Sequence, residues 1–282
     1  MTRSLTAILL FLLLPLQALA ALYGTIQGPT STLVELDQNT GAVIQTLGDI
    51  GYRVNGMTYD ATTGTLYATT ANGDTTFPNA LITINLTTGA GTPIGAGAGQ
   101  LVNVPAANSA GDLYGWSEDS DDLVLWDKTA GTVTVVGDSA LGSAEQSLAF
   151  DSTGTLYYVS VCCEGIQVID TSTGTATPGS TITGNTGSTL HPGDFLPGTS
   201  LLYAITEVGG TNPRSIDILD VTTGNVIDTI TAPANLHTLA FTGSAPPAVA
   251  PRTVPTLSQW SLILTAELLA LFGLIAHRRR FV

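Results

Sequence analysis

Basic residues are scarce in this sequence. Only 8 of its 282 residues are Lys or Arg, against 22 Asp or Glu, which gives a formal net charge of -14. Between Ala21 and Gly243, 21 acidic residues face three basic ones, Arg53, Lys128 and Arg214, so this region has a net charge of -18. Nucleic acids and anionic lipid surfaces are both bound through a positive footprint. We therefore expect neither of them as a partner of this region.

Sequence signatures of catalytic sites are also lacking. The chain has no Gly-x-Ser-x-Gly nucleophile elbow, no phosphate-binding loop and no zinc-ligand spacing. Its acidic residues are scattered, and an acid-base pair requires a geometry that spacing alone does not supply. We therefore name no catalytic residue and expect no resident cofactor, apart from the calcium considered below.

Cysteine occurs only twice, as the adjacent pair Cys162 and Cys163. Because exported proteins meet oxidising conditions, the pair predicts either a vicinal disulfide or two unpaired, small, buried side chains. A catalytic thiol is disfavoured, since no basic residue stands nearby in sequence to lower the thiol pKa.

The first twenty residues have the parts of a secretory signal peptide. A basic start with Arg3 is followed by an apolar run from Leu5 to Leu16 and by the small-x-small site at residues 18–20. We predict export through the Sec pathway and cleavage before Ala21. An uncleaved membrane anchor is the alternative, although the apolar run is short for a span.

The C-terminal residues read as a short membrane-retained tail. A Pro/Ala-rich linker is predicted over residues 244–253, because this composition favours an extended chain. A hydrophobic transmembrane helix is predicted over about residues 260–276, with the arginines after it in the cytoplasm. The stretch is shorter than the roughly 20 residues of a stable span and contains Glu267, so we expect only a weak, transient inner-membrane anchor.

Two short motifs frame this helix. They consist of Val254, Pro255, Thr256, Leu257, Ser258, Gln259 and Trp260 before it and Arg278, Arg279 and Arg280 after it. Over residues 254–282 this order resembles the IPTL-CTERM sorting signal of Gram-negative bacteria, a relative of the PEP-CTERM signals handled by exosortase-type enzymes. Val254 stands where the family name has Ile, and Gln259 where Glu is usual. The resemblance implies processing by an exosortase-type enzyme and delivery to the cell surface or extracellular matrix; an ordinary single-pass anchor is the alternative.

The region between the two ends repeats itself. A Leu-Tyr pair recurs every 43 to 47 residues, with its tyrosine at Tyr23, Tyr67, Tyr114, Tyr157 and Tyr203. A Thr-Gly or Ala-Gly turn closes each unit, at Gly41, Gly89, Gly131, Gly174 and Gly224. Short alternating or β-branched apolar stretches between turns predict four antiparallel strands per unit. Five such units predict an all-β fold over residues 21–243, a β-propeller with five four-stranded blades.

The repeat unit is incomplete at each end of this region. Residues 239–241 read as a first strand with no second strand after it, and residues 21–26 as a second strand with no first strand before it. Pairing the two would complete one blade and close the ring, the velcro closure of propellers. In this respect the sequence resembles the YVTN or quinoprotein-like propeller group. An open or irregular β-solenoid is the alternative.

The first strand of a propeller blade lines the central channel. Four residues before the aromatic position of this strand, every blade has a polar side chain: Asn55, Asn103, Gln146, His191 and His237. We predict that these five residues ring the channel mouth and bind a ligand. The alternative is that they bond buried backbone groups and ordered water at the axis. Two histidines without a third ligand do not make a catalytic zinc site.

An acidic loop falls on the same face as this ring, among the longer connections where function is expected. Glu118, Asp119, Asp121 and Asp122 offer the oxygen ligands that calcium prefers, so this loop is the candidate calcium site. It lacks the order of a dedicated calcium loop, and a solvated acidic turn is the alternative.

Together these features predict an exported, surface- or matrix-associated β-propeller that binds protein or polysaccharide without catalysis. Two other functions stay open: an extracellular polysaccharide lyase or hydrolase with its site at the channel mouth, and a purely structural matrix component.

Overall fold

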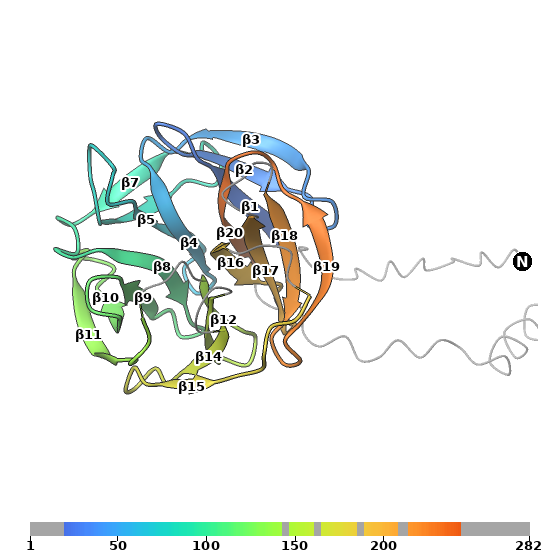
Figure 1. The fold of residues 1–282 in the computed structure, drawn as a ribbon. Coiled ribbons are helices and arrows are strands. Elements are labelled where there is room, and N and C mark those ends of the chain that lie inside the picture. Colours follow the sequence, from blue (N-terminus) through green and yellow to red (C-terminus); the bar gives the residue numbers. More distant parts are fainter. Residues whose placement is uncertain (1–19, 143–146, 161–164, 185–188, 208–213, 244–282) are drawn as a thin grey trace, which may run out of the picture. The chain divides into compact units, whose positions relative to one another are not determined.

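The computed structural model describes residues 20–142, 147–160, 165–184, 189–207 and 214–243. Every regular element named within these ranges is a β-strand, and the strands form five four-stranded antiparallel sheets arranged in a ring (Figure 1). This confirms the predicted five-bladed propeller. No helix among these residues is long and apolar enough to cross a membrane. The predicted signal peptide, linker and C-terminal helix lie outside the described residues.

Each blade runs from an innermost strand at the channel to an outermost strand at the rim. Blade 1 contains β20 (Leu236–Thr242), β1 (Ala21–Ile26), β2 (Thr32–Leu36) and β3 (Val43–Asp49). Blade 2 contains β4 (Val54–Asp60), β5 (Thr65–Thr70), β6 (Leu81–Ile84) and β7 (Gly91–Ile94). Blade 3 contains β8 (Val102–Ala107), β9 (Leu113–Ser117), β10 (Asp122–Trp126) and β11 (Val133–Asp138). Blade 4 contains β12 (Ser147–Phe150), β13 (Leu156–Ser160), β14 (Gly165–Ile169) and β15 (Ala176–Pro178). Blade 5 contains β16 (Thr189–Phe195), β17 (Leu201–Glu207), β18 (Ser215–Asp220) and β19 (Asn225–Thr231).

Blade 1 is assembled from both ends of the region. Strand β20 pairs antiparallel with β1, so that Ala21 lies opposite Thr242 and Gly24 lies opposite Leu239. The predicted velcro closure is therefore confirmed, and the open solenoid is excluded.

The hydrophobic core lies between the blades. Five clusters of buried side chains occupy the five interfaces between neighbouring blades. The cluster between blades 5 and 1, for example, joins Ile205 and Ile216 to Leu22 and Phe241. Outermost strands such as β3 and β11 are largely exposed, with Ile44 at 61 %. Burial of apolar surface between blades therefore holds the ring together.

The repeated tyrosines belong to these interfaces. Three of them pack on the innermost strand of the following blade, with ring centroids 5.1 to 5.6 Å apart, as the pairs Tyr114–Phe150, Tyr157–Phe195 and Tyr203–Phe241. Aromatic pairs of this kind contribute about 0.5–1.5 kcal/mol beyond the area that they bury. The most regular feature of the sequence thus has a structural role.

Lys128 takes the place of the aromatic partner between blades 2 and 3, where the innermost strand carries Ala107. Its ammonium lies 5.7 Å from the centroid of the Tyr67 ring and 2.8 Å from a carboxylate oxygen of the buried Asp60. Burial alone would raise the pKa of Asp60. Hydrogen bonds from Lys128 and from the threonines of the adjacent turn outweigh this effect and lower the pKa to about 2.

At the rim, turn glycines allow the backbones of neighbouring blades to pack closely. The five glycines that close the turns between third and fourth strands have φ between +67° and +77°. In blade 4, the Gly174 N–H donates to the carbonyl of Asp170. A Cβ on Gly174 would lie 2.3 Å from the carbonyl oxygen of Gly137 in blade 3. A side chain is therefore excluded both by the backbone conformation and by the next blade.

We expect Lys128→Met to lower the free energy of unfolding by about 2 kcal/mol at pH 7, because Asp60 stays buried without its cation. At pH values above 3.8, the pKa of Asp60 in the unfolded chain, the lowered pKa of Asp60 stabilises the folded protein. This contribution is lost as the pH falls through about 2. In the variant Asp60 takes up a proton at higher pH than in wild type. The loss of unfolding free energy relative to wild type should therefore shrink between pH 7 and pH 3. Urea unfolding of both proteins measures it, and an equal deficit at both pH values would contradict the assignment.

We expect Gly174→Ala to destabilise the protein clearly more than Gly154→Ala. Both glycines have positive φ, but a Cβ on Gly154 meets nothing within 4 Å. The control should cost about 1 kcal/mol of backbone strain, and Gly174→Ala about 1–3 kcal/mol more from overlap with blade 3. Thermal or urea unfolding compares the two, and similar losses would show that the blades do not interlock at this turn.

Candidate functional site

Four of the five predicted ring residues lie on innermost strands, at places where strand pairing is irregular. The pairing register shifts at or beside each of them: Asn55 in β4, Asn103 in β8, His191 in β16 and His237 in β20. A β-bulge of this kind inserts an unpaired residue and re-aims its side chain. Asn55 and His237 are themselves the unpaired residues, whereas in β8 and β16 the unpaired residues directly follow Asn103 and His191. The fifth predicted residue, Gln146, lies outside the described residues.

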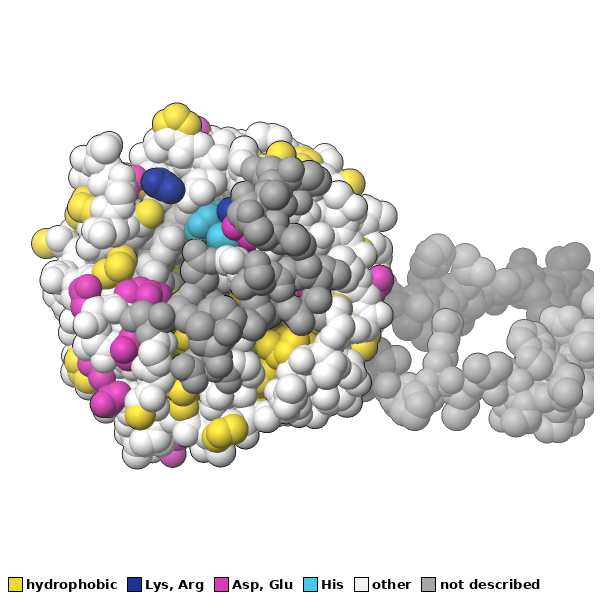
Figure 2. Space-filling model, in the orientation of Figure 1, with side chains coloured by type: hydrophobic (Ala, Val, Ile, Leu, Met, Phe, Trp, Pro, Cys, Tyr) yellow, Lys and Arg dark blue, Asp and Glu magenta, His cyan; other side chains and the backbone are white. Residues whose placement is uncertain are grey.

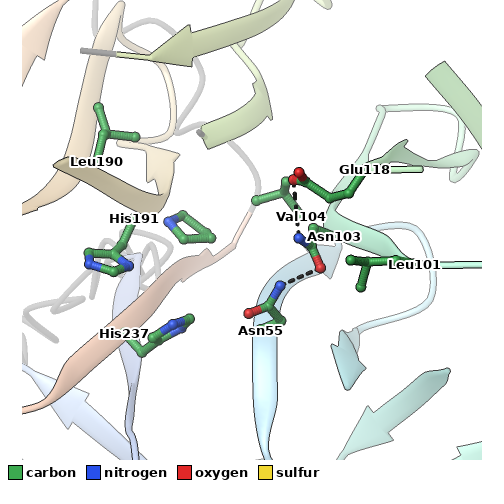
Figure 3. Close-up of a pocket in the computed structure, with 9 residues that line it drawn as sticks. Asn55, Leu101, Asn103, Val104, Glu118, Leu190, His191 and His237 are labelled. Carbon is green, nitrogen blue, oxygen red and sulfur yellow. Dashed lines mark hydrogen bonds between the residues drawn. The ribbon is translucent and has the colours of Figure 1, made fainter. Parts of the chain in front are cut away.

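The four side chains line one cavity of about 210 Å³. Figure 3 shows the two histidines on one side of it and Asn55, Asn103 and Glu118 on the other. The remaining lining is apolar and consists of Leu101, Val104, Leu190 and Pro192. On the molecular surface the histidines occupy a hollow, with acidic and basic side chains beside them (Figure 2). The structure therefore brings together the described members of the predicted ring.

A chain of hydrogen bonds crosses the asparagine side of the cavity. The Asn55 amide donates to the Asn103 side-chain oxygen, and the Asn103 amide donates to Glu118 Oε1 at 3.1 Å. Each carboxamide has two N–H groups and one oxygen. After these bonds, each Asn retains one N–H that no described contact uses, so this side can still donate to a ligand.

The histidine side is electrically neutral near pH 7. The imidazole rings of His191 and His237 lie 5.0 Å apart. Burial lowers the pKa of His191, the Arg214 charge lowers it further, and Glu207 opposes both. Burial also lowers the pKa of His237 to about 3, assisted by the neighbouring His191 and arginines. Both rings therefore present one donor and one acceptor nitrogen each.

One nitrogen of this pair is unsatisfied. His237 is 9 % exposed, and its Nδ1 has no hydrogen-bond partner among the described residues. A buried polar group without a partner costs about 1–3 kcal/mol. A ligand hydroxyl or a water molecule in the cavity would remove this cost.

Glu207 and Arg214 complete the site, although sequence analysis did not identify them. Glu207 Oε2 accepts from Arg214 Nε at 2.6 Å and lies 3.1 Å from His191 Nε2. Burial would raise the pKa of Glu207, but the bonds from His191 and Arg214 outweigh it and keep the pKa below its usual range. Arg214 also donates to the carbonyl of Leu236, the neighbour of His237. The one available signal was the rarity of basic residues, of which Arg214 is one.

The acidic loop has its own partners. Glu118 accepts from Asn103, Asp119 accepts from the backbone N–H of Leu101 at 2.8 Å, and Asp122 accepts from Ser120 at 2.5 Å. Asp121 has φ +59° and donates its N–H to the carbonyl of Ser117. The described part of the chain holds no group of three His, Cys, Asp or Glu placed to bind a metal ion. Calcium at this loop stays a prediction without support from these contacts.

Two further predictions fall outside the described residues. They are the disulfide between Cys162 and Cys163 and the contacts of the sorting motif at residues 254–260 and 278–280.

We expect Arg214→Met to raise the pKa of His191, because the Arg214 charge helps to lower it. Glu207→Gln should lower the same pKa further, since Glu207 opposes that effect. Proton NMR titration of the histidine ring signals measures both changes. Lys128→Met removes a positive charge between blades 2 and 3 and is the control. The same His191 pKa in wild type and in all three variants would contradict the charge network of His191, Glu207 and Arg214.

Residues 253–280 match the family described as the IPTL-CTERM motif. The chain therefore carries a C-terminal sorting signal of the kind that a sorting enzyme processes, which indicates export and surface localisation. No curated protein matches the chain.

Solved structures share the fold at low identity. A chain of the "Nidogen/Laminin Complex" is 15 % identical with a TM-score of 0.53, over 80 % of this chain and 100 % of that chain. A protein of unknown function from Bacteroides thetaiotaomicron VPI-5482 is 12 % identical with a TM-score of 0.51, over 76 % of this chain and 57 % of that one. TolB from Acinetobacter baumannii is 14 % identical with a TM-score of 0.48, over 75 % and 52 %. These likenesses concern the fold alone. By its own strand order and motif, the chain is a five-bladed propeller that carries an IPTL-CTERM sorting signal.

Proposed function

We propose that this chain is a non-catalytic binding module that holds an uncharged polysaccharide of the cell surface or matrix at its polar channel mouth. Four neutral polar side chains in the lining of the cavity carry this proposal. Asn55, Asn103, His191 and His237 offer amide and imidazole donors and acceptors without net charge. Sugar hydroxyls both donate and accept hydrogen bonds, so they match these groups.

The charge of the domain favours an uncharged polymer. A region with 21 acidic and three basic residues repels acidic polysaccharides through its long-range field. The cavity of about 210 Å³ is smaller than the roughly 300–1,000 Å³ of pockets that enclose a whole small ligand. It therefore suits one sugar unit of a longer chain, with the rest of the polymer outside.

The acid-base properties of the site favour binding over catalysis. A general base or acid works best when its pKa lies near the operating pH. The pKa of His237 is about 3, and that of Glu207 lies below its usual range. Both groups are then weak bases at neutral pH, and neither is a proton donor there.

The proposed route to the surface follows from the two ends of the chain. The N-terminal residues direct Sec export, and the tail holds the protein briefly in the inner membrane. An exosortase-type enzyme then processes the tail and releases the propeller to the surface or matrix. The match of residues 253–280 to the IPTL-CTERM motif supports this order of events.

Isothermal titration with neutral gluco-, manno- and galacto-oligosaccharides and with uronic-acid oligosaccharides tests the proposal. We expect a neutral series to bind and the acidic series not to bind. His237→Ala and Asn103→Ala should each weaken binding about tenfold, because each removes a hydrogen bond in a buried site. Thr134→Ala, on the exposed outermost strand of blade 3, is the matched control and should bind as wild type.

Other results would overturn the proposal. Reducing ends or unsaturated products that appear with wild type and vanish in His237→Ala would make the protein an enzyme. Lack of binding to every oligosaccharide by a folded protein would favour a structural role.

A further inference from the structure

The opposite mouth of the channel contains a second cavity, of about 400 Å³. Four positions after each ring residue, the innermost strands contribute Tyr59, Ala107, Phe150, Phe195 and Phe241 to its lining. Four blades thus supply an aromatic ring, and blade 3 supplies only a methyl group. The small side chain of Ala107 leaves room beside the aromatic residues.

This aromatic mouth is separate from the polar mouth. The two cavities share no lining residue. Between them the innermost strands approach closely: a Cβ on Gly56 of β4 would lie 2.8 Å from Val104 Cα of β8. The two cavities are therefore lined by different residues and are distinct sites.

A single recessed carboxylate lies among the aromatic rings. Asp194 precedes Phe195 on β16, and its two oxygens accept from the backbone N–H groups of Phe195 and Phe241, each at 2.8 Å. A carboxylate has about four acceptor sites, so about two stay free. None of the ion pairs among the described residues involves Asp194.

Asp194 has no cationic partner among the residues that line the cavity. Burial raises its pKa to about 7, while the two backbone N–H groups act in the opposite direction. The cavity lining contains no Lys, Arg or His, and its other charged residue is the acidic Asp151. Removing a carboxylate from water is costly unless a cation pairs with it. A positively charged ligand would supply the missing partner.

We propose that the aromatic mouth binds an organic ammonium group, held against the aromatic rings with the Asp194 carboxylate as its counter-ion. Ammonium groups are attracted to the faces of aromatic rings, and cages of such rings recognise quaternary ammonium ligands. Tyr59 and Phe150 are half-buried and thus accessible from the cavity. The net charge of -18 also concentrates cations at the surface of the domain. This site is independent of the polysaccharide proposal.

Choline and its uncharged isostere 3,3-dimethyl-1-butanol provide a matched pair of probes. We expect choline to bind the full chain at least tenfold more tightly than the isostere in isothermal titration at pH 8. Asp194→Asn should weaken choline binding about tenfold, and Tyr59→Leu about threefold. Asp228→Asn removes one carboxylate on the outermost strand of blade 5 and should bind choline as wild type.

Choline affinity should also depend on pH. It should fall as Asp194 takes up a proton between pH 8 and pH 5.5, and this dependence should be lost in Asp194→Asn. The other ionisable side chains of the cavity lining are Tyr59 on β4 and Asp151 after β12, and Tyr203 of β17 pairs with Asp194 and packs on Phe241.

Three outcomes would overturn the proposal. The first is equal binding of choline and the isostere by wild type, which requires no variant to fold. The second is absence of choline binding to the folded wild-type protein at millimolar choline concentrations. The third is wild-type affinity in an Asp194→Asn protein that melts cooperatively.

Discussion

The antiparallel pairing of β20 with β1 is the constraint on which the rest of the structure depends. Without it, blade 1 would lack its channel strand, and the ring would be open between blades 5 and 2. The same strand carries His237 at the polar mouth and Phe241 at the aromatic mouth. It also contributes Leu239 and Ala240 to the clusters on its two sides. One pairing between distant segments therefore completes the core and both cavities.

Hydrogen bonds to side chains also connect the innermost strands of neighbouring blades. Three hydroxyls accept from backbone N–H groups of the next blade: Thr238 from Met57, Thr58 from Ala107 and Ser147 from Gly193. Asp194 does the same for Phe241, but with a carboxylate. The equivalent contact in those three cases is made by a neutral hydroxyl, whereas Asp194 brings an ionisable carboxylate that a cation at this mouth would pair with.

The fold could be predicted because each of its determinants is local and repeated. Tyr23, Gly41 and their equivalents recur at nearly constant spacing, and the phase shift at residues 21–26 and 239–241 indicates how the ring closes. The polar ring could be located by counting back from the aromatic position of each first strand. The electrostatic neighbours could not, because Glu207 and Arg214 meet His191 only through the pairing of β17 with β16 and β18.

The contacts of the acidic residues could not be predicted from the local sequence. The acidic loop predicted calcium, yet Glu118 and Asp119 bond Asn103 and the backbone of Leu101. Asp194 stands in the segment Pro192-Gly193-Asp194, which looks like an ordinary turn. Its burial against Phe241 depends on a bulge in β16 and on the last strand of the region, neither of which a local pattern contains.

The closing pair also orders events in time. A chain that is synthesised from its N-terminus presents β1 early and β20 about two hundred residues later. Contacts so distant in sequence form slowly, because the chain must lose much of its freedom before they form. Until then blade 1 has an unpaired inner edge, and such edges recruit strands from other chains. Completion of the ring therefore waits for residue 242, and the newly made chain is most vulnerable to aggregation just before this last strand is available.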